Sequence, residues 1–218
     1  PHVAFQIMER VRKGRGLRPE DEQVMKQVGV PEWYIESCRK ISYLFPKAHA
    51  VAYVTMAFRI AYFNVHYPLD FYCAYFTVRA DDFDAQLVQD GLKGVKHTIS
   101  TITEKGNGAT AKERNVLTIA EVVLEAMLRG IEFLPVDLYL SHPTHFQKRN
   151  GKLLPPLAAV QGVGVGAAQA IAQGRNEGEF ASWEDIRLRC GVSKTVIEAL
   201  ATIGVLDSLP ESSQLSLF

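Results

Sequence analysis

The residues best suited to chemistry form a glycine-rich turn in the last third of the chain. Gly162, Gly164 and Gly166 stand at alternate positions after an apolar segment, and small residues follow them. Such a turn exposes backbone N–H groups at the start of a helix, where a phosphate oxygen can bind without a basic side chain. Glycine suits this role because it adopts positive φ and lets the phosphate approach closely. We therefore predict a phosphate-binding turn formed by Gly162, Val163, Gly164 and Gly166.

The turn and its helix resemble a helix-hairpin-helix, a module that holds duplex DNA by its backbone rather than by its sequence. A dinucleotide fingerprint fits less well, because no strand-like run precedes the glycines and no acidic residue follows as a βαβ unit requires. A structural interpretation also stays open, namely a glycine-terminated helix packed on its neighbour. A degenerate second copy spans Trp183–Leu206. It lacks paired glycines, so we expect it to pack more than to bind.

The last five residues have the composition of an anchor peptide. Three large apolar side chains can enter a surface pocket while a glutamine hydrogen-bonds at its rim, and a few such groups carry most of the affinity of short peptides. The alternative is that the apolar end folds back onto the protein's own core. The pattern resembles the bacterial sliding-clamp-binding consensus at all five positions, and we predict clamp binding by Gln214, Leu215, Ser216, Leu217 and Phe218.

A third set of candidate residues lies on one predicted helix. Lys47 and His49 stand at its start, where a positive helix terminus and cationic donors suit a triphosphate. Tyr53 follows one turn later and can stack on a base or a sugar, and Arg59 reaches the same side less directly. The competing interpretation is that His49 and Tyr53 are ordinary half-buried side chains of an aromatic-rich core.

A family resemblance decides between these interpretations. The segments Phe45–Tyr53, His66–Pro68 and Tyr75–Arg79 resemble the fingers region of the PolC-type DNA polymerase III alpha subunits of Gram-positive bacteria. The shorter pattern Lys-x-His-Ala-x-x-Tyr followed by His-Tyr-Pro is similar to the sister DnaE-type subunits. With the glycine-rich turn and the terminal peptide, the resemblance covers essentially the whole chain.

The resemblance implies a fingers segment that contacts the incoming deoxynucleoside triphosphate and the template. It also implies a module for double-stranded primer-template DNA, a tether to the beta sliding clamp, and other replisome subunits as partners. Lys47, His49, Tyr53 and Arg59 are carried over as nucleotide- and template-binding residues. In the family, palm carboxylates hold two Mg²⁺ ions for catalysis. These lie before Pro1 in the family's order, so we expect no catalytic residue, no metal site and no activity in this segment alone.

One pair of carboxylates has the spacing of a polymerase metal pair. Asp82 and Asp84 flank Phe83. They follow a predicted helix end and precede Ala85, and aspartates at such positions commonly cap the next helix. We therefore expect capping, not metal binding.

Two other function classes account for part of the sequence. A non-enzymatic helix-hairpin-helix adaptor that binds the sliding clamp would explain the last third of the chain but leave Lys47–Tyr53 without a role. A helix-hairpin-helix glycosylase would need an aspartate shortly after the glycine-rich turn, and Asp185 stands in the wrong place for it.

The composition of the chain says less about its function than these motifs do. The formal net charge is zero, so DNA contacts must come from local patches or backbone amides. Cys38, Cys73 and Cys190 are isolated, which predicts free thiols in a reducing cytoplasm. The most apolar stretch, residues 48–61, is too short to cross a bilayer, so we expect no membrane partner. The chain starts at Pro1 without Met, and we interpret it as a cytoplasmic fragment of a longer, nucleoid-associated protein.

The elements that must position these residues are mainly α-helical. Apolar periodicity predicts helices over residues 3–12, 31–43, 48–64, 69–79, 85–103 and 111–128, with another starting at Pro19. Arg149-Asn150-Gly151-Lys152 suits a β-hairpin turn. Short helices then occupy 156–209, and 210–213 reads as a flexible linker. We predict an incomplete fingers segment over 1–131, a duplex-binding helix-hairpin-helix domain over 132–210 and a flexible clamp-binding tail over 211–218.

Overall fold

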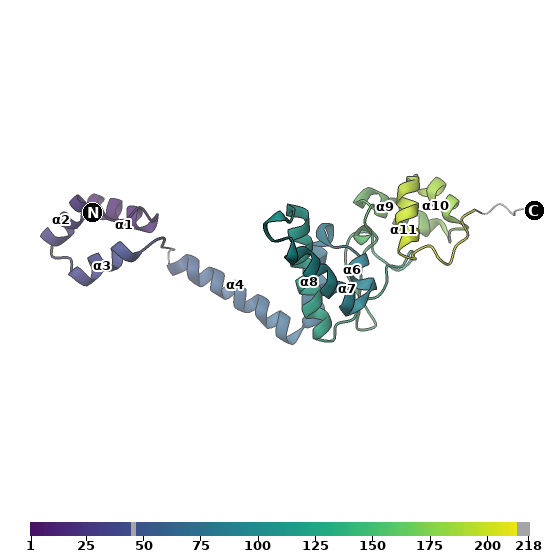
Figure 1. The fold of residues 1–218 in the computed structure, drawn as a ribbon, viewed down its shortest axis with the longest axis horizontal. Helices are drawn as coiled ribbons and strands as arrows, with labels where there is room; N and C mark the ends of the chain where they lie inside the picture. The colour runs from purple at the N-terminus through teal and green to yellow at the C-terminus, as the bar shows by residue number, and fades with distance from the viewer. Residues whose placement is uncertain (45–46, 213–218) are drawn as a thin grey trace, which may run out of the picture. The chain divides into compact units, whose positions relative to one another are not determined.

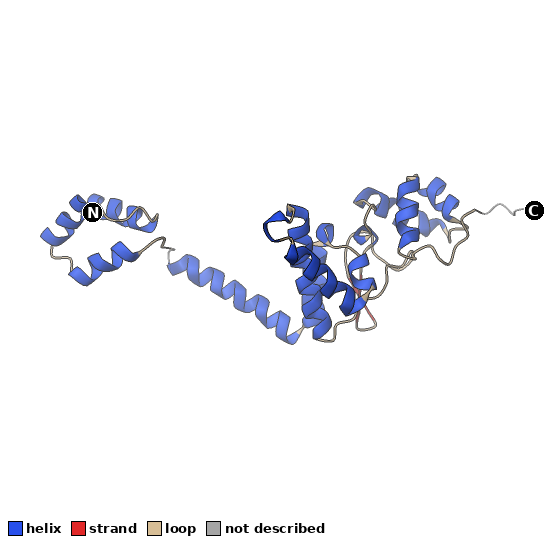
Figure 2. Ribbon diagram, in the orientation of Figure 1, coloured by secondary structure: helices blue, strands red, loops and turns tan. Residues whose placement is uncertain are grey.

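A computed structural model describes residues 1–44 and 47–212, and these are mainly helical (Figures 1 and 2). The mainly α fold class with one small hairpin is confirmed. No helix in the described part is long and apolar enough to span a membrane. The helices are α1 His2–Arg12, α2 Pro19–Gln27, α3 Glu32–Lys40, α4 Lys47–His66, α5 Pro68–Val78, α6 Gln86–Gln89, α7 Gly91–Glu104, α8 Ala111–Leu128, α9 Val165–Gly174, α10 Trp183–Cys190 and α11 Lys194–Thr202, and the strands are β1 Gln147–Arg149 and β2 Lys152–Leu154.

Two predicted helices differ from the observed ones. The segment predicted as one helix over 85–103 is divided into α6 and α7, because Gly91 adopts a left-handed φ of 60°. The helix predicted to reach residue 43 ends at Lys40. There Ile41 turns to an extended conformation, and the amide of Leu44 donates to the carbonyl of Arg12 at 3.0 Å. Both breaks come from local turns that interrupt an apolar pattern.

The chain forms two compact units, of which the first comprises Pro1–Ala61. Its three short helices share a small core, made of Ile7, Val11, Met25, Ile35 and Cys38. The side chain of Asp21 is nearly buried beside this core and pairs with two arginines, Arg10 at 3.3 Å and Arg18 at 3.1 Å. These neighbours keep the pKa of Asp21 below its usual value, chiefly through the hydrogen bond from Arg18.

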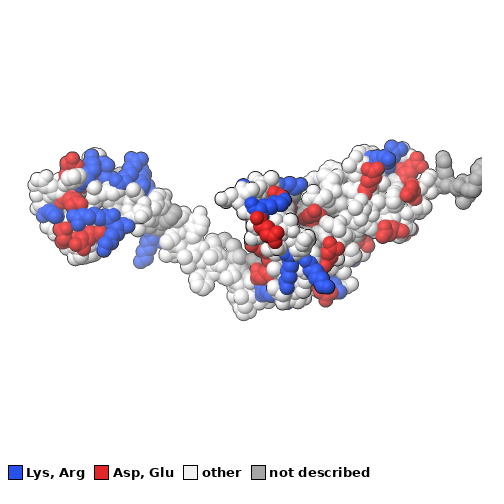
Figure 3. All heavy atoms as spheres, viewed as in Figure 1, with Lys and Arg blue, Asp and Glu red and all other residues white. Residues whose placement is uncertain are grey.

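Helix α4 is apolar on all sides, and none of its described side chains is buried. Phe58 is 74% exposed and Tyr53 is 67% exposed. Figure 3 shows the middle of this helix almost without charged side chains on the face in view. A helix that is hydrophobic all round is normally buried, so its exposure here is the most unusual feature of the fold.

The second unit begins at Tyr62 and has one continuous hydrophobic core. An aromatic cluster lies at its centre. The ring centroids of Phe83 and Phe146 are 4.8 Å apart, and those of Phe76 and Phe133 are 5.6 Å apart. The core takes in residues before and after position 131, so the boundary predicted there falls within a single packed unit. The predicted division of function between 1–131 and 132–210 stays a prediction.

The predicted hairpin is present within this unit. Strands β1 and β2 are antiparallel, with Arg149 paired to Lys152. Asn150 and Gly151 both adopt positive φ, of 50° and 76°. That combination is typical of a type I′ turn, whose twist matches the strands that it joins. The Asn-Gly pair thus suits the positive φ that both turn positions require.

The C-terminal part of the second unit contains two helical hairpins in sequence. Helix α9 follows the first turn, and helices α10 and α11 flank the second. Gly174 allows the end of α9 to lie against α10, since a Cβ on it would stand 2.5 Å from Cys190 Sγ. The three cysteines of the chain are free thiols, as predicted.

Candidate nucleic-acid interface

The first hairpin turn presents unpaired amides at the start of α9. Gly164 is the N-cap residue and offers no side chain to cap the helix. The first hydrogen bond within the helix runs from the amide of Ala168 to the carbonyl of Gly164, at 3.0 Å. The amides of Val165, Gly166 and Ala167 precede it and have no intrahelical acceptor. These donors, at the positive end of the helix dipole, can bind an anionic oxygen.

The glycines of this turn differ in why they must be glycine. Gly162 adopts a φ of 90°, and a Cβ on it would lie 3.4 Å from the Cβ of Ala199. Its identity is therefore required by the backbone conformation. Gly164 and Gly166 have ordinary φ, and a Cβ on either would meet nothing within 4 Å. Packing within the described chain does not require glycine there, which favours close approach by an external group.

The turn is held in place by Val163. Its side chain is buried, and its amide donates to the carbonyl of Val160 at 2.9 Å. The turn borders a hollow of about 340 Å³, lined by Phe83, Ala158 and residues 159–165. None of these lining residues is acidic. The lining therefore carries no carboxylate that would repel an anion.

A lysine from a distant helix lies at the edge of this turn. Lys112, on α8, has its Nζ 3.4 Å from the side-chain oxygen of Gln161. It also lies close enough to Asp84 to favour the charged carboxylate, although burial raises the pKa of Asp84 overall. No local sequence pattern marks Lys112, because only the packing of α8 brings it to the turn. It places a positive charge at the edge of the turn.

The second turn follows the same backbone path as the first. Gly191 has a left-handed φ of 62°, as Gly162 does, and Val192 is buried like Val163. The N-cap residues also match, with φ −70° and ψ 160° at Gly164 and φ −73° and ψ 160° at Ser193. Ser193 differs because its Oγ accepts from the amide of Val196 at 3.4 Å. The predicted degenerate copy is thus a structural repeat whose cap position is already filled.

The residues predicted to face a nucleotide lie on α4. His49 and Tyr53 come together on one side, with ring centroids 4.3 Å apart. Lys47 starts the helix, Arg59 lies further along it, and all four side chains are exposed. Half-burial in a core, the competing interpretation, does not describe these side chains in the structure. Phe45 and Pro46, which begin the motif, lie outside the described residues.

The predicted clamp-binding residues Gln214–Phe218 also lie outside the described part of the chain. The segment that leads to them was predicted to be a flexible linker, yet it is hydrogen-bonded to α10. The carbonyl of Pro210 accepts from the amide of Trp183 at 3.0 Å, and that of Glu211 accepts from Glu184 at 3.2 Å. The chain is therefore attached to α10 as far as residue 211.

The aspartates with metal-pair spacing have separate structural partners. Asp82 forms an ion pair with Arg79 at 3.1 Å and accepts from Asn115 at 3.1 Å. Asp84 accepts from the amide of Gln86 at 2.9 Å, at the start of α6. Within residues 1–44 and 47–212, no cluster of three or more His, Cys, Asp or Glu side chains could hold a metal ion.

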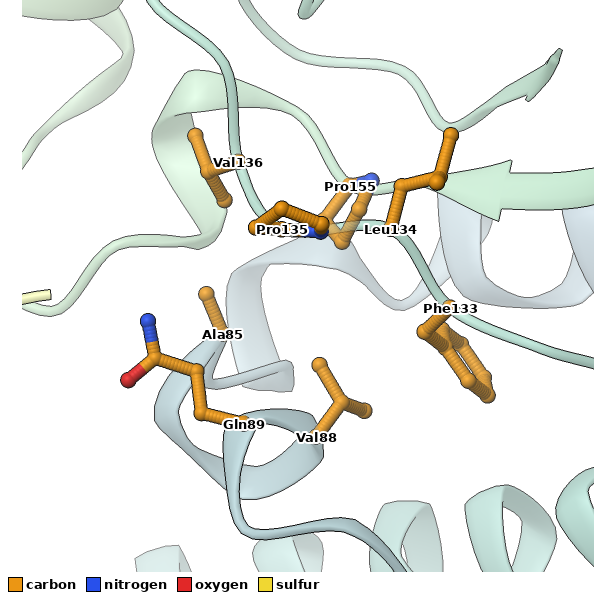
Figure 4. A pocket seen from close by; sticks show the side chains of 8 residues that line it. All are labelled: Ala85, Val88, Gln89, Phe133, Leu134, Pro135, Val136 and Pro155. Carbon is orange, nitrogen blue, oxygen red and sulfur yellow. The ribbon is translucent and has the colours of Figure 1, made fainter. Parts of the chain in front are cut away.

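A second hollow, also of about 340 Å³, lies between α6 and the segment 133–136 (Figure 4). Figure 4 shows Pro135 and Pro155 on one side and Val88 on the other. Gln89 is the polar side chain in its lining, and its Nε2 donates to the carbonyl of Ile203 at 2.7 Å. The lining contains no titratable group, so this hollow offers no acid–base chemistry.

Comparison with known proteins agrees with the geometry of the two hairpins. Residues 130–215 match the helix-hairpin-helix motif family. The chain is 58% identical over 216 residues to DNA polymerase III PolC-type of Caldanaerobacter subterraneus subsp. tengcongensis, which covers 99% of the chain. The proteins of the same name from Clostridium perfringens and Bacillus subtilis are 54% and 52% identical over 218 residues. The chain spans about 15% of the length of these relatives. By sequence, it belongs to the PolC-type DNA polymerase III family, as a segment that carries a helix-hairpin-helix motif.

Proposed function

We propose that this segment serves a DNA-directed DNA polymerase by holding primer-template DNA, contacting the incoming nucleotide and tethering the enzyme to a sliding clamp. The observation that carries the proposal is identity of 52–58% to PolC-type polymerases along the whole chain. The open glycines at the start of α9 add a physical reason for DNA to bind.

Duplex binding takes place at the first hairpin turn. A phosphate oxygen accepts hydrogen bonds from the amides of Val165 and Gly166, while Lys112 supplies a positive charge nearby. Neither group contacts a base edge, so the turn binds every sequence alike. A protein with zero formal net charge can hold DNA in this way because its donors are fixed backbone groups.

Nucleotide binding is assigned to the exposed start of α4. Lys47 and His49 donate to triphosphate oxygens, and Tyr53 stacks on the base or the sugar, with Arg59 as a further cation. The tilted contact of the His49 and Tyr53 rings keeps both on one side of the helix. The positive end of the helix dipole points to the same place.

Clamp tethering is assigned to Gln214, Leu215, Ser216, Leu217 and Phe218, with the beta sliding clamp and the other replisome subunits as partners in the cytoplasm. The apolar side chains enter the clamp's surface pocket and Gln214 hydrogen-bonds at its rim.

Phosphoryl transfer itself is assigned to residues elsewhere in the polymerase. It needs paired carboxylates that hold Mg²⁺. We place that set outside this segment, as the family resemblance implies, and propose that the segment alone is inactive. A non-enzymatic adaptor that joins a helix-hairpin-helix to the clamp is the weaker alternative. It does not explain why the residues before 130 are also similar in sequence to PolC-type polymerases.

Nucleotide kinetics in the full-length polymerase distinguish the polymerase function from the adaptor function. Lys47→Ala removes a triphosphate contact, so the KM for deoxynucleotide rises by about tenfold, which corresponds to one charge-assisted hydrogen bond. Lys40→Ala, a matched loss of an exposed lysine at the end of α3, leaves the KM unchanged. Equal KM values for both variants and the parent enzyme would overturn the nucleotide assignment.

A further inference from the structure

A hollow of about 520 Å³ in the first unit, which we call the basic hollow, is rich in cations. It lies along α1 and the loop that follows, and four of its lining side chains are basic, namely Arg10, Lys13, Arg15 and Arg18. The chain as a whole has zero formal net charge, so this excess of cations is a local feature. A local basic patch is the electrostatic mark of a site for a polyanion.

A tight turn at the end of α1 fixes the backbone at Arg15. The amide of Gly14 donates to the carbonyl of Val11, and that of Arg15 donates to the carbonyl of Arg10, both at 3.0 Å. With Gly14 at a φ of 68°, these two bonds form a Schellman motif. A Cβ on Gly14 would also clash with the carbonyl oxygen of Ser42. The fold therefore holds the backbone that carries Arg15 in one place.

The carboxylate at the base of the hollow neutralises only part of its charge. Asp21 is shared by Arg10 and Arg18, at 3.3 and 3.1 Å, so this cluster keeps one positive charge. Glu20 lies 3.9 Å from Arg18, but its side chain is 75% exposed, and water screens it. The side chain of Arg10 donates no hydrogen bond among the described residues, so its outer nitrogens can donate to a ligand.

The cation with the fewest internal contacts is Arg15. Glu9 is shared by Arg12 at 2.8 Å and Lys13 at 3.1 Å, so these two cations have an acidic neighbour. The side chain of Arg15 is exposed and forms no hydrogen bond or ion pair with any residue that the structure describes. Its guanidinium donors are therefore available to a ligand, and they suit a phosphate.

An aromatic ring stands at the same hollow. Phe5 lines it and is 59% exposed. Ile7 and Val11 are the residues of α1 that enter the core, so the packing of this unit does not need Phe5. Proteins bind single-stranded nucleic acid by combining cations for the phosphates with aromatic rings on which bases stack. In a duplex the base faces are already stacked on one another, so a single strand suits this ring better.

We propose that the basic hollow binds single-stranded DNA, with a backbone phosphate on Arg10 and Arg15 and one unpaired base stacked on Phe5. DNA follows from the polymerase family to which the chain belongs. Neither contact distinguishes one base from another, so binding is independent of sequence. The site goes beyond the duplex, nucleotide and clamp contacts proposed above and does not depend on them.

Fluorescence anisotropy of a labelled oligothymidylate, titrated with the full chain, tests the site. Arg15→Ala removes a phosphate contact and no internal one, so affinity falls by about tenfold. The slope of log K against log salt decreases in size by about 0.7, the value for one phosphate of a single strand. Arg187→Ala on α10 is the matched control, because Arg187 is also exposed and its side chain has no partner in the described part of the chain. It changes affinity by less than about twofold, well below one lost phosphate contact.

Phe5→Ala distinguishes a single strand from a simple anion. Loss of the stacked ring weakens oligothymidylate binding by about fivefold or more. Trp33→Ala, which removes an exposed ring of α3 outside the hollow, leaves the affinity unchanged. Affinity for a duplex of the same length stays unchanged in Arg15→Ala and in Phe5→Ala.

Two results would overturn the proposal. One is equal oligothymidylate affinity in Arg15→Ala and the unchanged chain. The other is a loss in Arg15→Ala that single strand and duplex share and that Phe5→Ala does not reproduce, which would make the hollow a general anion site. Both results leave the duplex turn at α9 and the nucleotide residues of α4 to their own tests.

Discussion

The two hairpin turns of the C-terminal region have the same backbone conformation but different residues at the helix N-cap position. Gly162 and Gly191 both take left-handed φ, and the N-cap residues Gly164 and Ser193 have nearly identical dihedral angles. Ser193 uses its hydroxyl to cap its own helix. Gly164 leaves the equivalent position open. One turn thus caps its helix with a side chain, and the other has no side chain at the cap position.

The comparison separates two uses of glycine that look alike in a sequence. At the first position of each turn glycine is needed for the conformation of the backbone. At Gly164 and Gly166 it leaves space that the described chain does not use. A stability measurement detects the first use, and a binding measurement detects the second.

The largest expected effect is on stability. Gly162→Val places a β-branched residue at a φ of 90° and close to Ala199, so the free energy of unfolding falls by about 2 kcal/mol or more. Gly164→Val occupies an allowed extended conformation in open space and lowers it by at most about 1 kcal/mol, the loss typical of an unfavourable N-cap residue. Urea unfolding of both variants checks this. Equal losses would mean that Gly164 is also structural.

Ser193→Ala tests the second turn. Loss of an N-cap side chain costs about 1 kcal/mol of stability. We expect duplex affinity to stay within about twofold, a margin well below one lost phosphate contact. Urea unfolding and fluorescence anisotropy with a labelled duplex measure the two effects. A loss of duplex affinity as large as that from a change at Gly164 would make the turns functionally equivalent and break the comparison.

The first turn has a pH-sensitive support that the second lacks. Nδ1 of His142 accepts from the amides of Thr144 and His145, at 3.1 and 3.0 Å, which requires the neutral ring. The carbonyl of His142 accepts from Leu157, on the approach to the turn. The pKa of His142 is lowered, first by burial and then by the neighbouring His145 and Arg175.

Mildly acidic pH destabilises the folded chain through His142. In the unfolded chain His142 titrates near its ordinary value of about 6.5, so below that pH the unfolded state binds more protons. The free energy of unfolding therefore falls as pH is lowered from about 6.5 toward the folded pKa. In His142→Asn the amide oxygen accepts the same two bonds without titrating, and this part of the pH dependence disappears. Urea unfolding between neutral and mildly acidic pH checks the prediction. If the free energy of unfolding of His142→Asn depended on pH as steeply as that of the unchanged chain, the prediction would be contradicted.

The smallest effect belongs to the cation at the first turn. Lys112→Ala removes one charge near the phosphate, so duplex affinity falls by a few-fold and the slope of log K against log salt decreases in size by about 1. Lys96→Ala, an exposed lysine on α7, serves as the control. An equal change in both variants would show a general charge effect.

Local sequence signals predicted much of the fold. The helix over Ala111–Leu128 is observed with those bounds, because Thr110 and Glu113 form a capping box at its start. The Asn150-Gly151 turn was equally clear. The predicted helix over 85–103 was wrong at Asp90-Gly91, where a left-handed glycine interrupts an otherwise continuous apolar pattern.

The sequence was less informative where distant segments meet. The glycine-rich turn was recognisable, but Lys112 reaches Gln161 only through the packing of α8. Hydrogen bonds from the first amides of α10 to the carbonyls of Pro210 and Glu211 join segments that no local pattern connects. Pro210–Ser212 therefore had the composition of a flexible linker although its backbone is held in place.

Duplex affinity of Gly164→Lys is the most direct test of the central claim that the first turn binds DNA phosphate. The comparison is with Gly108→Lys, which adds the same side chain at another open glycine of ordinary φ. The new charge alone would strengthen nonspecific binding. We predict that Gly164→Lys nevertheless weakens binding of several unrelated duplexes by about tenfold, the size of one lost charge-assisted contact, while Gly108→Lys does not. Equal or tighter binding by Gly164→Lys would contradict the account and make the turn purely structural.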